Sequence, residues 1–338
     1  MTTAGTVAGL LGRASSRKRV LPSDARVTAA PYERVTVDGR AYFVKRISPT
    51  SDWIMRASGD HVHRPYQVWR AGILDQAPGC IDHTVVAMDL ERDHDDAVLT
   101  VVMRDVGGFL VPAGDTTVPP LQHANFIGDM AALSAAFWGW EDDIGLTGMA
   151  QRLRLFAPDN IAAEFAAAEA PWPVRAAAAG WNALAGRSPL LAELARLVHA
   201  RPEVITGPLG ETPRTFLHGD WKLGNLGAHE DGRTILLDWA CPGSGPACWD
   251  LCWYLALNRA RLPERKEKVI RRFRVALEER GIDTGGWWES QLDLCMIGIM
   301  ATFGWEKALG ADDELAWWQG KVLDAAARRG VGTPSGSG

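Results

Sequence analysis

One short segment of the chain combines an acid, a lysine and an amide side chain at close spacing. It reads His218-Gly-Asp220-Trp-Lys222-Leu-Gly-Asn225, and a second acid, Asp238, ends an apolar run thirteen residues later. Transfer of a phosphoryl group needs a carboxylate that orients the attacking hydroxyl, and oxygen ligands that hold a divalent metal against the phosphates. We therefore expect Asp220 to be the catalytic base and Lys222 to neutralise the migrating group. Asn225 and Asp238 are the expected metal ligands.

Each aspartate alone has a structural alternative, because an Asp in a loop commonly forms a turn and an Asp after a strand commonly caps a helix. Five polar residues at this spacing, flanked by apolar strand-like runs, are much harder to explain by local structure alone. The pattern therefore favours a catalytic loop over two unrelated turns.

The same pattern resembles that of the aminoglycoside phosphotransferase and choline kinase family, which are small-molecule kinases with the protein-kinase fold. The family pattern is His-Gly-Asp, four residues, Asn, and then an Asp that ends an apolar strand. Asp-x-Lys-x-x-Asn is also the order of the protein-kinase catalytic loop. Further on, Gly245-Pro246 and Trp249-Asp250-Leu251 match a family segment whose aspartate supports this loop. The resemblance is close over residues 214–255 and looser elsewhere, and it implies that His218 and Asp250 hold the loop in place.

The resemblance implies an α+β fold with two lobes, as in protein kinases. A small β-rich N-terminal lobe over residues 26–104 would bind nucleotide. A larger, mostly helical C-terminal lobe over residues 105–329 would hold the catalytic loop and the acceptor, and within it Thr147 is a candidate helix cap. Residues 1–25, rich in Gly, Ala, Ser and Arg, and the Gly- and Ser-rich residues 330–338 are expected to be disordered.

The N-terminal lobe is expected to place a lysine in the nucleotide cleft. Two strand-like runs flank Asp38-Gly39, a preferred two-residue turn, and so predict a β-hairpin. Alternation along the second strand puts Phe43, Lys45 and Ile47 on one face. A lysine between two apolar residues favours a cleft, with an exposed surface lysine as the alternative. The resemblance assigns Lys45 to the α- and β-phosphates of the nucleotide.

The last strand of the N-terminal lobe is expected to end just before Gly107-Gly108, at the junction of the two lobes. In the resembled fold, backbone groups at this junction bind the edge of adenine. The resemblance therefore implies that four consecutive residues contact the nucleotide: Met103, Arg104, Asp105 and Val106.

Two features depart from the resembled family. No glycine occurs in residues 26–37, so no Gly-rich loop precedes the lysine strand. Kinases also position this lysine with a glutamate from a first-lobe helix, but the chain has no glutamate between Glu33 and Glu91. Asp60 is the expected replacement, because it lies just before a helix predicted over residues 65–74. The other candidates near that helix are Asp52, Gln67 and Asp75.

The acceptor site is expected close to the catalytic loop. Trp221 follows the base and Trp239 follows the metal aspartate, so each is expected either to contact the acceptor or to pack beneath the loop. Acidic residues late in the chain could bind a cationic acceptor, and Glu306, within an aromatic segment, is the best candidate. The others are expected on solvated helix faces: Glu289, Asp293, Asp312, Asp313 and Glu314.

Composition sets broad limits on the partners of the protein. With 338 residues, 47% apolar and 23% charged, the chain is typical of a globular protein, and no apolar run is long enough to cross a bilayer. A net charge of −5, without a dense basic block apart from residues 13–19 and 264–274, argues against nucleic acid as a partner. The N-terminal apolar run precedes its basic residues, the reverse of a secretory signal, so we expect a cytoplasmic protein.

The five cysteines are odd in number and lack the spacing of a disulfide framework. Cys241, Cys248 and Cys252 are close in sequence, which raises the question of a zinc site. Because they contain no Cys-x-x-Cys pair, buried reduced thiols are the favoured interpretation.

Together these expectations describe a kinase that uses ATP and Mg²⁺ to phosphorylate a hydroxyl group of a small molecule. An aminoglycoside-like antibiotic, an amino alcohol and a sugar all remain open as acceptors. The alternative is a catalytically impaired, nucleotide-binding regulator with the same fold. A protein kinase is disfavoured, because Gly245-Pro246 begins only seven residues after Asp238 and leaves no room for an activation loop.

Overall fold

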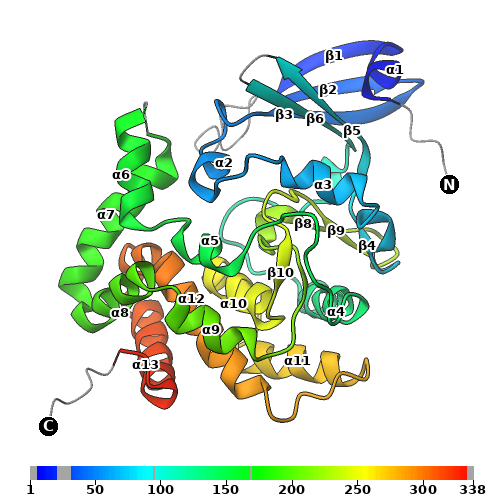
Figure 1. Cartoon of the computed structure of the whole chain (residues 1–338). Helices are drawn as coiled ribbons and strands as arrows, with labels where there is room; N and C mark the ends of the chain where they lie inside the picture. Colours follow the sequence, from blue (N-terminus) through cyan, green and yellow to red (C-terminus); the bar gives the residue numbers. More distant parts are fainter. Residues whose placement is uncertain (1–5, 21–31, 94–95, 168–169, 333–338) are drawn as a thin grey trace, which may run out of the picture.

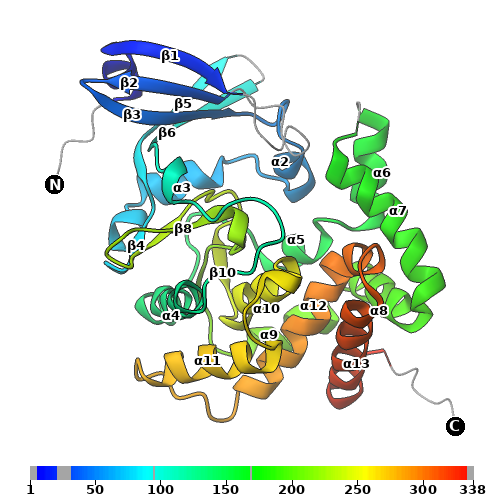
Figure 2. The same cartoon turned by 180° about the vertical axis from the view of Figure 1, so that it is seen from behind.

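The computed structural model describes residues 6–20, 32–93, 96–167 and 170–332. Figures 1 and 2 show a β-sheet region, formed by the N-terminal part of the chain, beside a larger helical region formed by the rest. This is the α+β arrangement that the sequence predicts. None of the helices in the described part of the chain is long and apolar enough to cross a membrane.

The N-terminal region is built on a five-stranded antiparallel sheet in the order β1-β2-β3-β6-β5. The predicted hairpin is confirmed, because β2 pairs with β3. Its turn residues Asp38 and Gly39 have φ angles of 49° and 75°, both positive as a type I′ turn requires. The strand bounds are Ala14–Val20 (β1), Tyr32–Val37 (β2), Arg40–Ile47 (β3), Val85–Asp93 (β5) and Asp96–Arg104 (β6).

Helix α1 (Val7–Leu11) precedes the sheet and packs on one of its faces. Residues 6–20 thus form α1 and β1, so the prediction of disorder for residues 1–25 is wrong for this part. The prediction failed because β1 is an edge strand with an exposed centre, and so lacks the apolar alternation that marks most strands. The rest of that segment lies outside the described residues. The sheet residues that α1 covers are Val35, Val37, Val44, Ala87 and Val102.

The opposite face of the sheet carries Lys45 and packs on the main core. Two short helices, α2 (Trp53–Ser58) and α3 (Arg64–Arg70), lie along this side (Figure 1). Helix α3 is the helix predicted over residues 65–74. It ends earlier than predicted, because Gly72 takes a left-handed conformation with φ of 68°.

The helical region surrounds one central helix, α12, which packs against α7, α8, α10 and α13. Almost all of its side chains are buried, as expected for a helix that is apolar on every side. The helix bounds are Pro120–Ala136 (α4), Met149–Arg154 (α5), Pro158–Ala167 (α6), Trp172–Arg187 (α7), Pro189–Ala200 (α8), Glu203–Gly210 (α9), Cys248–Leu257 (α10), Lys266–Glu278 (α11), Trp288–Ala308 (α12) and Asp312–Arg329 (α13).

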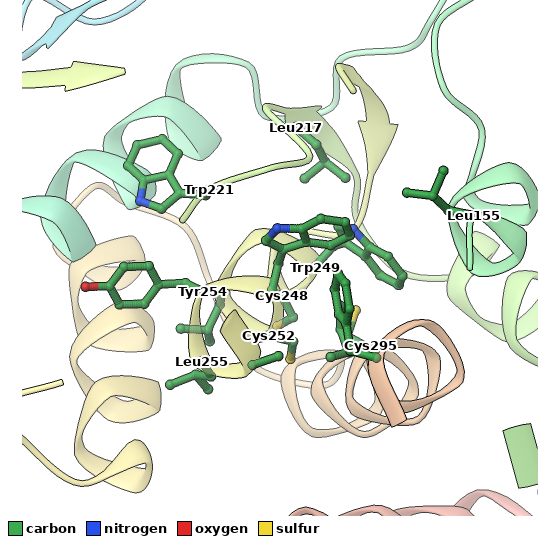
Figure 3. Close-up of a cluster of buried hydrophobic side chains, with 14 of the residues drawn as sticks. Leu155, Leu217, Trp221, Cys248, Trp249, Cys252, Tyr254, Leu255 and Cys295 are labelled. Carbon is green, nitrogen blue, oxygen red and sulfur yellow. The ribbon is translucent and has the colours of Figure 1, made fainter. Parts of the chain in front are cut away.

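The core between α10 and α12 contains three of the cysteines. Cys248, Cys252 and Cys295 lie close to Trp249 in this core (Figure 3). Burial raises the pKa of all three thiols, so they stay protonated and pack as small apolar groups. The interpretation of Cys248 and Cys252 as buried thiols is confirmed, whereas Cys241 is only partly buried.

Short strands between the two regions carry the catalytic loop. Strand β7 (Thr215–Leu217) pairs with β10 (Gly243–Gly245), and β8 (Leu226–Ala228) pairs with β9 (Thr234–Leu236). Strand β9 also pairs with β4 (Ile81–Asp82), which comes from the N-terminal region. The catalytic loop therefore follows β7, and the second aspartate follows β9, on backbone that is fixed by pairing.

Candidate active site

The carboxylate of Asp220 is held by three side-chain donors. Its Oδ1 accepts a hydrogen bond from Trp253 Nε1 at 2.9 Å. Its Oδ2 accepts from Lys222 Nζ at 2.6 Å and from Asn225 Nδ2 at 2.8 Å. The residue is largely buried, so these contacts fix the orientation of the carboxylate. A fixed carboxylate on a loop is the geometry that a general base needs.

Asp250, in the first turn of α10, holds the backbone of this loop. Its Oδ2 accepts from the backbone N–H of His218 and its Oδ1 from that of Gly219, each at 3.0 Å. Gly219 has a φ of 79°, and a Cβ there would lie 2.0 Å from the backbone oxygen of Cys241. Only glycine fits this position, which explains the Gly of the His-Gly-Asp pattern.

His218 joins the two segments that carry the aspartates. Burial lowers its pKa to about 4, so the imidazole is neutral. Its Nε2 lies 3.0 Å from the carbonyl oxygen of Leu237, and its Nδ1 lies 3.2 Å from the backbone N–H of Asp220. The neutral ring must therefore donate from Nε2 and accept at Nδ1. This single tautomer ties the catalytic loop to the residue before Asp238.

The state of His218 predicts a loss of stability in mild acid. The unfolded chain binds a proton near pH 6.5 and the folded chain only near pH 4, so the stabilisation is full above pH 6.5 and is lost as the pH falls towards 4. One pKa unit corresponds to about 1.36 kcal/mol. Lowering the pH from 7 to 5 should therefore reduce the contribution of His218 to the free energy of unfolding by about 2 kcal/mol.

Urea unfolding of the wild type and of His218→Asn at both pH values measures this contribution as a difference. A difference is needed because burial raises the pKa of Asp250 to about 6, and that group titrates in the same range with the opposite sign. His61→Asn, at an exposed histidine, is the control and should keep the wild-type pH dependence. Equal pH dependence in wild type and His218→Asn would refute the neutral, buried assignment.

Asp238 and Asn225 lie on neighbouring backbone segments, and both side chains carry oxygen atoms. The backbone N–H of Leu237 donates to the carbonyl oxygen of Asn225 at 2.9 Å, which places the two residues together. Burial alone would raise the pKa of Asp238, but the ammonium groups of Lys45 and Lys222 outweigh it and lower this pKa, so the carboxylate is charged. Because Asn225 Nδ2 donates to Asp220, its Oδ1 is the atom available to a metal ion.

This pair of oxygen donors fits Mg²⁺. Magnesium prefers oxygen ligands and is commonly bound by one or two carboxylates together with substrate phosphates. The described residues contain no group of three or more His, Cys, Asp or Glu side chains that could hold a metal by themselves. A metal ion here would therefore depend on phosphate oxygens as well as on Asp238 and Asn225.

Lys45 reaches across from the N-terminal sheet to the second aspartate. Its Nζ lies 3.1 Å from Oδ1 of Asp238, and the side chain is largely buried. The side chain therefore points towards the catalytic segment, and the alternative of an exposed surface lysine is wrong. Burial disfavours the ammonium, but the charge of Asp238 and the nearby Tyr32 and Asp52 outweigh it and raise the pKa of Lys45. The lysine is therefore positively charged at neutral pH.

The prediction that Asp60 pairs with Lys45 is wrong. Asp60 accepts hydrogen bonds from the backbone N–H groups of Val62 and Arg64 instead, and it begins the turn before α3. Asp52 is the acid from this region whose charge raises the pKa of Lys45. It caps α2, accepting from the backbone N–H of Ile54 at 2.8 Å.

Three residues expected at an acceptor site have other surroundings. Trp221 is 0% exposed and Trp239 is 4% exposed, so both pack in the core beneath the loop. Glu306 forms ion pairs with Arg259 and with Lys307, at 2.8 Å for the latter. The two tryptophans thus take the predicted alternative of packing beneath the loop, and acceptor contact by Glu306 stays a prediction.

The four residues predicted to contact the nucleotide lie where β6 meets the helical region. Met103 and Arg104 end β6, and the backbone N–H of Asp105 donates to Ala41 of β3 at 3.1 Å. The Asp105 carboxylate pairs with Arg34 at 2.8 Å. The backbone of Val106, next along the chain, is partly engaged by the turn that follows. Nucleotide contact at these four residues stays a prediction.

Sequence reasoning missed two residues that shape the loop. Trp253 donates to Asp220, and its position three residues after Asp250 on a helix could have indicated that it faces the same loop. Asn258, which follows α10, accepts from the backbone N–H of Leu223 at 3.0 Å and donates to the carbonyl oxygen of Tyr254 at 2.7 Å. Nothing in the local sequence pointed to Asn258.

Comparisons with known proteins identify the family of the chain. A model of the phosphotransferase enzyme family matches residues 27–284, more than half of the chain. The chain therefore belongs to the phosphotransferase enzyme family. Membership places it among the small-molecule kinases that act on hydroxyl groups. No protein of curated function matches the sequence significantly.

Solved structures with the same fold are similar along nearly their whole length. Choline kinase LicA from Streptococcus pneumoniae is 12% identical, with 95% of this chain and 96% of that chain covered and a TM-score of 0.50. Amicoumacin kinase hAmiN, in complex with AMP-PNP and Ca²⁺, is 13% identical over 94% and 91%, with a TM-score of 0.51. Aminoglycoside phosphotransferase APH(4)-Ia is 16% identical over 96% and 97%, with a TM-score of 0.50. At these identities the likeness concerns the fold alone.

Proposed function

We propose that the protein transfers the γ-phosphoryl group of ATP to a hydroxyl group of a small molecule, with Mg²⁺ as the metal. The observation that carries this proposal is the meeting of Asp220, Asn225 and Asp238 with Lys45, which come from three separate parts of the sequence. Such a set is needed to hold a nucleotide triphosphate and a hydroxyl in line for transfer.

Each residue has a role that its contacts support. Asp220 orients the acceptor hydroxyl and takes its proton as the oxygen attacks the γ-phosphorus, and ADP leaves with the bridging oxygen. Lys222, whose ammonium lies 2.6 Å from Asp220, can neutralise charge on the moving group. Lys45 can bind the α- and β-phosphates once it separates from Asp238. Asp238 and Asn225 would hold the metal ion, which neutralises phosphate charge when bound.

A catalytically impaired regulator has less support than the kinase. Two absences in the sequence favour this alternative: a first-lobe glutamate for Lys45 and a Gly-rich loop before the lysine strand. The acids near Lys45 in this structure are Asp238 and Asp52, so the lysine keeps acidic neighbours without that glutamate. All the residues of the catalytic loop are also present, and their side chains are held by specific hydrogen bonds.

A screen of ADP release tests the proposed function. The wild-type protein, ATP and Mg²⁺ would be incubated with aminoglycosides, macrolides, choline-like alcohols, amino sugars, and neutral and acidic polyols. We expect ADP release above the acceptor-free rate with at least one class, and its loss when EDTA removes the metal. Thermal shift with ATP and Mg²⁺ reports binding separately, because a ligand that prefers the folded state raises its stability. Binding without turnover by any acceptor would favour the regulator instead.

A further inference from the structure

A small cavity lies beside the catalytic loop, on the side of α5. Its lining is mostly apolar and includes a few polar side chains. The lining residues are Ser58 from α2, Thr147, Gln151, Arg152 and Leu155 from α5 and the residues beside it, and Gly219, Cys241 and Trp253 from around the loop. The cavity volume open to a water-sized group is about 10 Å³. That is room for about one water molecule or one ligand oxygen.

Arg152 lies in the wall of this cavity, and two of its three guanidinium nitrogens have no hydrogen-bond partner among the described residues. Arg152 is only 3% exposed, and among the described residues neither its Nε nor its Nη2 finds an acceptor. The guanidinium lies close to the backbone of two glycines. A Cβ on Gly219 would lie 2.2 Å from its Nη1, and a Cβ on Gly243 would lie 2.7 Å from its Nη2. A buried cation without an acceptor is costly, so an unsatisfied guanidinium in a native protein calls for an explanation such as a bound water, ion or ligand.

No neighbouring acid or thiol satisfies this guanidinium by a hydrogen bond. Both oxygens of Asp250 accept from loop backbone N–H groups, although its charge acts on Arg152 from a distance. Burial raises the pKa of the Cys241 thiol to about 12, so it is not an anion at neutral pH. The sequence predicted that Thr147 caps the following helix, α5, and this prediction is wrong. Gly148 precedes the helix instead, and the buried Thr147 Oγ1 has no partner either.

The cavity adjoins the proposed catalytic base. Gly219 is the residue before Asp220, and Trp253 both lines the cavity and donates to Asp220 Oδ1. A group bound in the cavity would therefore anchor a molecule whose next few atoms lie at Asp220. This is the position expected for part of the acceptor.

Most of the late acidic residues that could have bound a cationic acceptor form ion pairs with neighbouring cations. Asp293 pairs with Arg328 and Arg329, and Glu314 pairs with Lys266 at 2.5 Å. Glu289 pairs with Arg274, and Asp312 pairs with Arg187. The cavity lining contains no acidic side chain, and Arg152 and Thr147 can each donate a hydrogen bond there. The chemistry beside the base thus favours a substrate whose oxygen atoms accept hydrogen bonds over a substrate that carries ammonium groups.

We propose that Arg152 and Thr147 bind a carboxylate oxygen of the acceptor, so that the substrate is a small hydroxy acid. This inference rests on the proposed kinase function and specifies its substrate class. A carboxylate is the group that a planar guanidinium binds best, because it accepts charge-assisted hydrogen bonds. The hydroxyl to be phosphorylated then lies a few bonds away, next to Asp220.

Matched acids and alcohols test the substrate class. Glycerate and glycerol, 4-hydroxybutanoate and 1,4-butanediol, and gluconate and glucitol differ in each pair by one carboxylate. With wild-type protein, ATP and Mg²⁺, we expect kcat/KM for the acid to exceed that for its alcohol by at least about tenfold, the discrimination expected when a buried polar group loses its partner. Equal or better use of the alcohols, or turnover of cationic acceptors only, would overturn the proposal.

Two variants connect the preference to the cavity. Arg152→Met keeps the volume of the side chain, and Thr147→Val removes only the hydroxyl, which covers the case in which the first variant does not fold. Each should raise KM for the acids, with kcat and the KM for the alcohols changed much less. Arg154→Gln, an exposed arginine on the same helix, is the control and should behave as wild type. Unchanged KM for the acids in both folded variants would overturn the assignment.

A binding measurement separates failure of this inference from failure of the kinase. Thermal shifts with AMP-PNP and Mg²⁺ would be recorded for each acid and its alcohol, in wild type and in the cavity variants. Suppose that the acids raise the melting temperature of the wild type but not of the cavity variants, and that no acceptor gives ADP release. That result would support the carboxylate site and reject the kinase function. ADP release without an acid-specific shift or rate would keep the kinase and reject the carboxylate site.

Discussion

Replacing Asp220 with asparagine should lower kcat by about a thousandfold while leaving the protein folded, since a positioned base contributes about 10²–10⁴ in rate. The amide keeps the shape of the carboxylate and one oxygen acceptor for Trp253 or Asn225. It cannot take the proton of the acceptor hydroxyl, and it no longer balances the ammonium of Lys222. ADP release with any acceptor that the wild type phosphorylates gives the rate, and circular dichroism checks the fold.

Asp231→Asn is the matched control for this change. Asp231 lies in the exposed turn between β8 and β9, where its carboxylate pairs with Arg233. The same chemical change at that site should leave kcat within a factor of two or so of the wild type, as for most exposed sites. If Asp220→Asn retained more than a tenth of the wild-type kcat, another group would have to be the base.

Replacing Asp250 with alanine should destabilise the protein by about 3–5 kcal/mol. Both of its oxygens accept backbone N–H groups of the catalytic loop, and the variant would bury these donors without partners. It would also remove a negative charge that acts on the buried Arg152. Urea unfolding followed by tryptophan fluorescence measures the change in the free energy of unfolding.

Two further variants separate the role of the hydrogen bonds from a general effect of substitution. Asp250→Asn keeps one acceptor oxygen for the loop and should lose less stability than Asp250→Ala. Asp312→Ala changes an aspartate that is 97% exposed, and exposed ion pairs contribute little, so its stability should stay near that of the wild type. A loss below about 1 kcal/mol in Asp250→Ala would show that the loop does not depend on this carboxylate.

The catalytic loop could be predicted because its geometry is largely local. Asp220, Lys222 and Asn225 lie within six residues, and their mutual hydrogen bonds follow from that spacing. Lys45 could be predicted from strand alternation, which depends only on the period of the backbone. The Asp250 segment was recognised from its family pattern, and its contacts agree with the expected support of the loop.

The predictions that failed involve contacts between distant parts of the sequence. The sequence shows an acid before a predicted helix at Asp60, but it gives no sign that α2 forms eight residues earlier with Asp52 as its cap. The tryptophans beside the two aspartates face the core because β7 and β9 are themselves buried. Arg152 could not have been singled out, since the loops that enclose it lie more than sixty residues further along the chain.

The position of α1 and β1 has a practical consequence for anyone who shortens the protein. The family match begins at residue 27, so a truncation guided by it would delete both elements. Five apolar side chains of the sheet, now covered by α1, would then meet solvent, and β2 would become an open edge. Exposed strands of this kind favour self-association, so the first twenty residues should be kept for soluble expression.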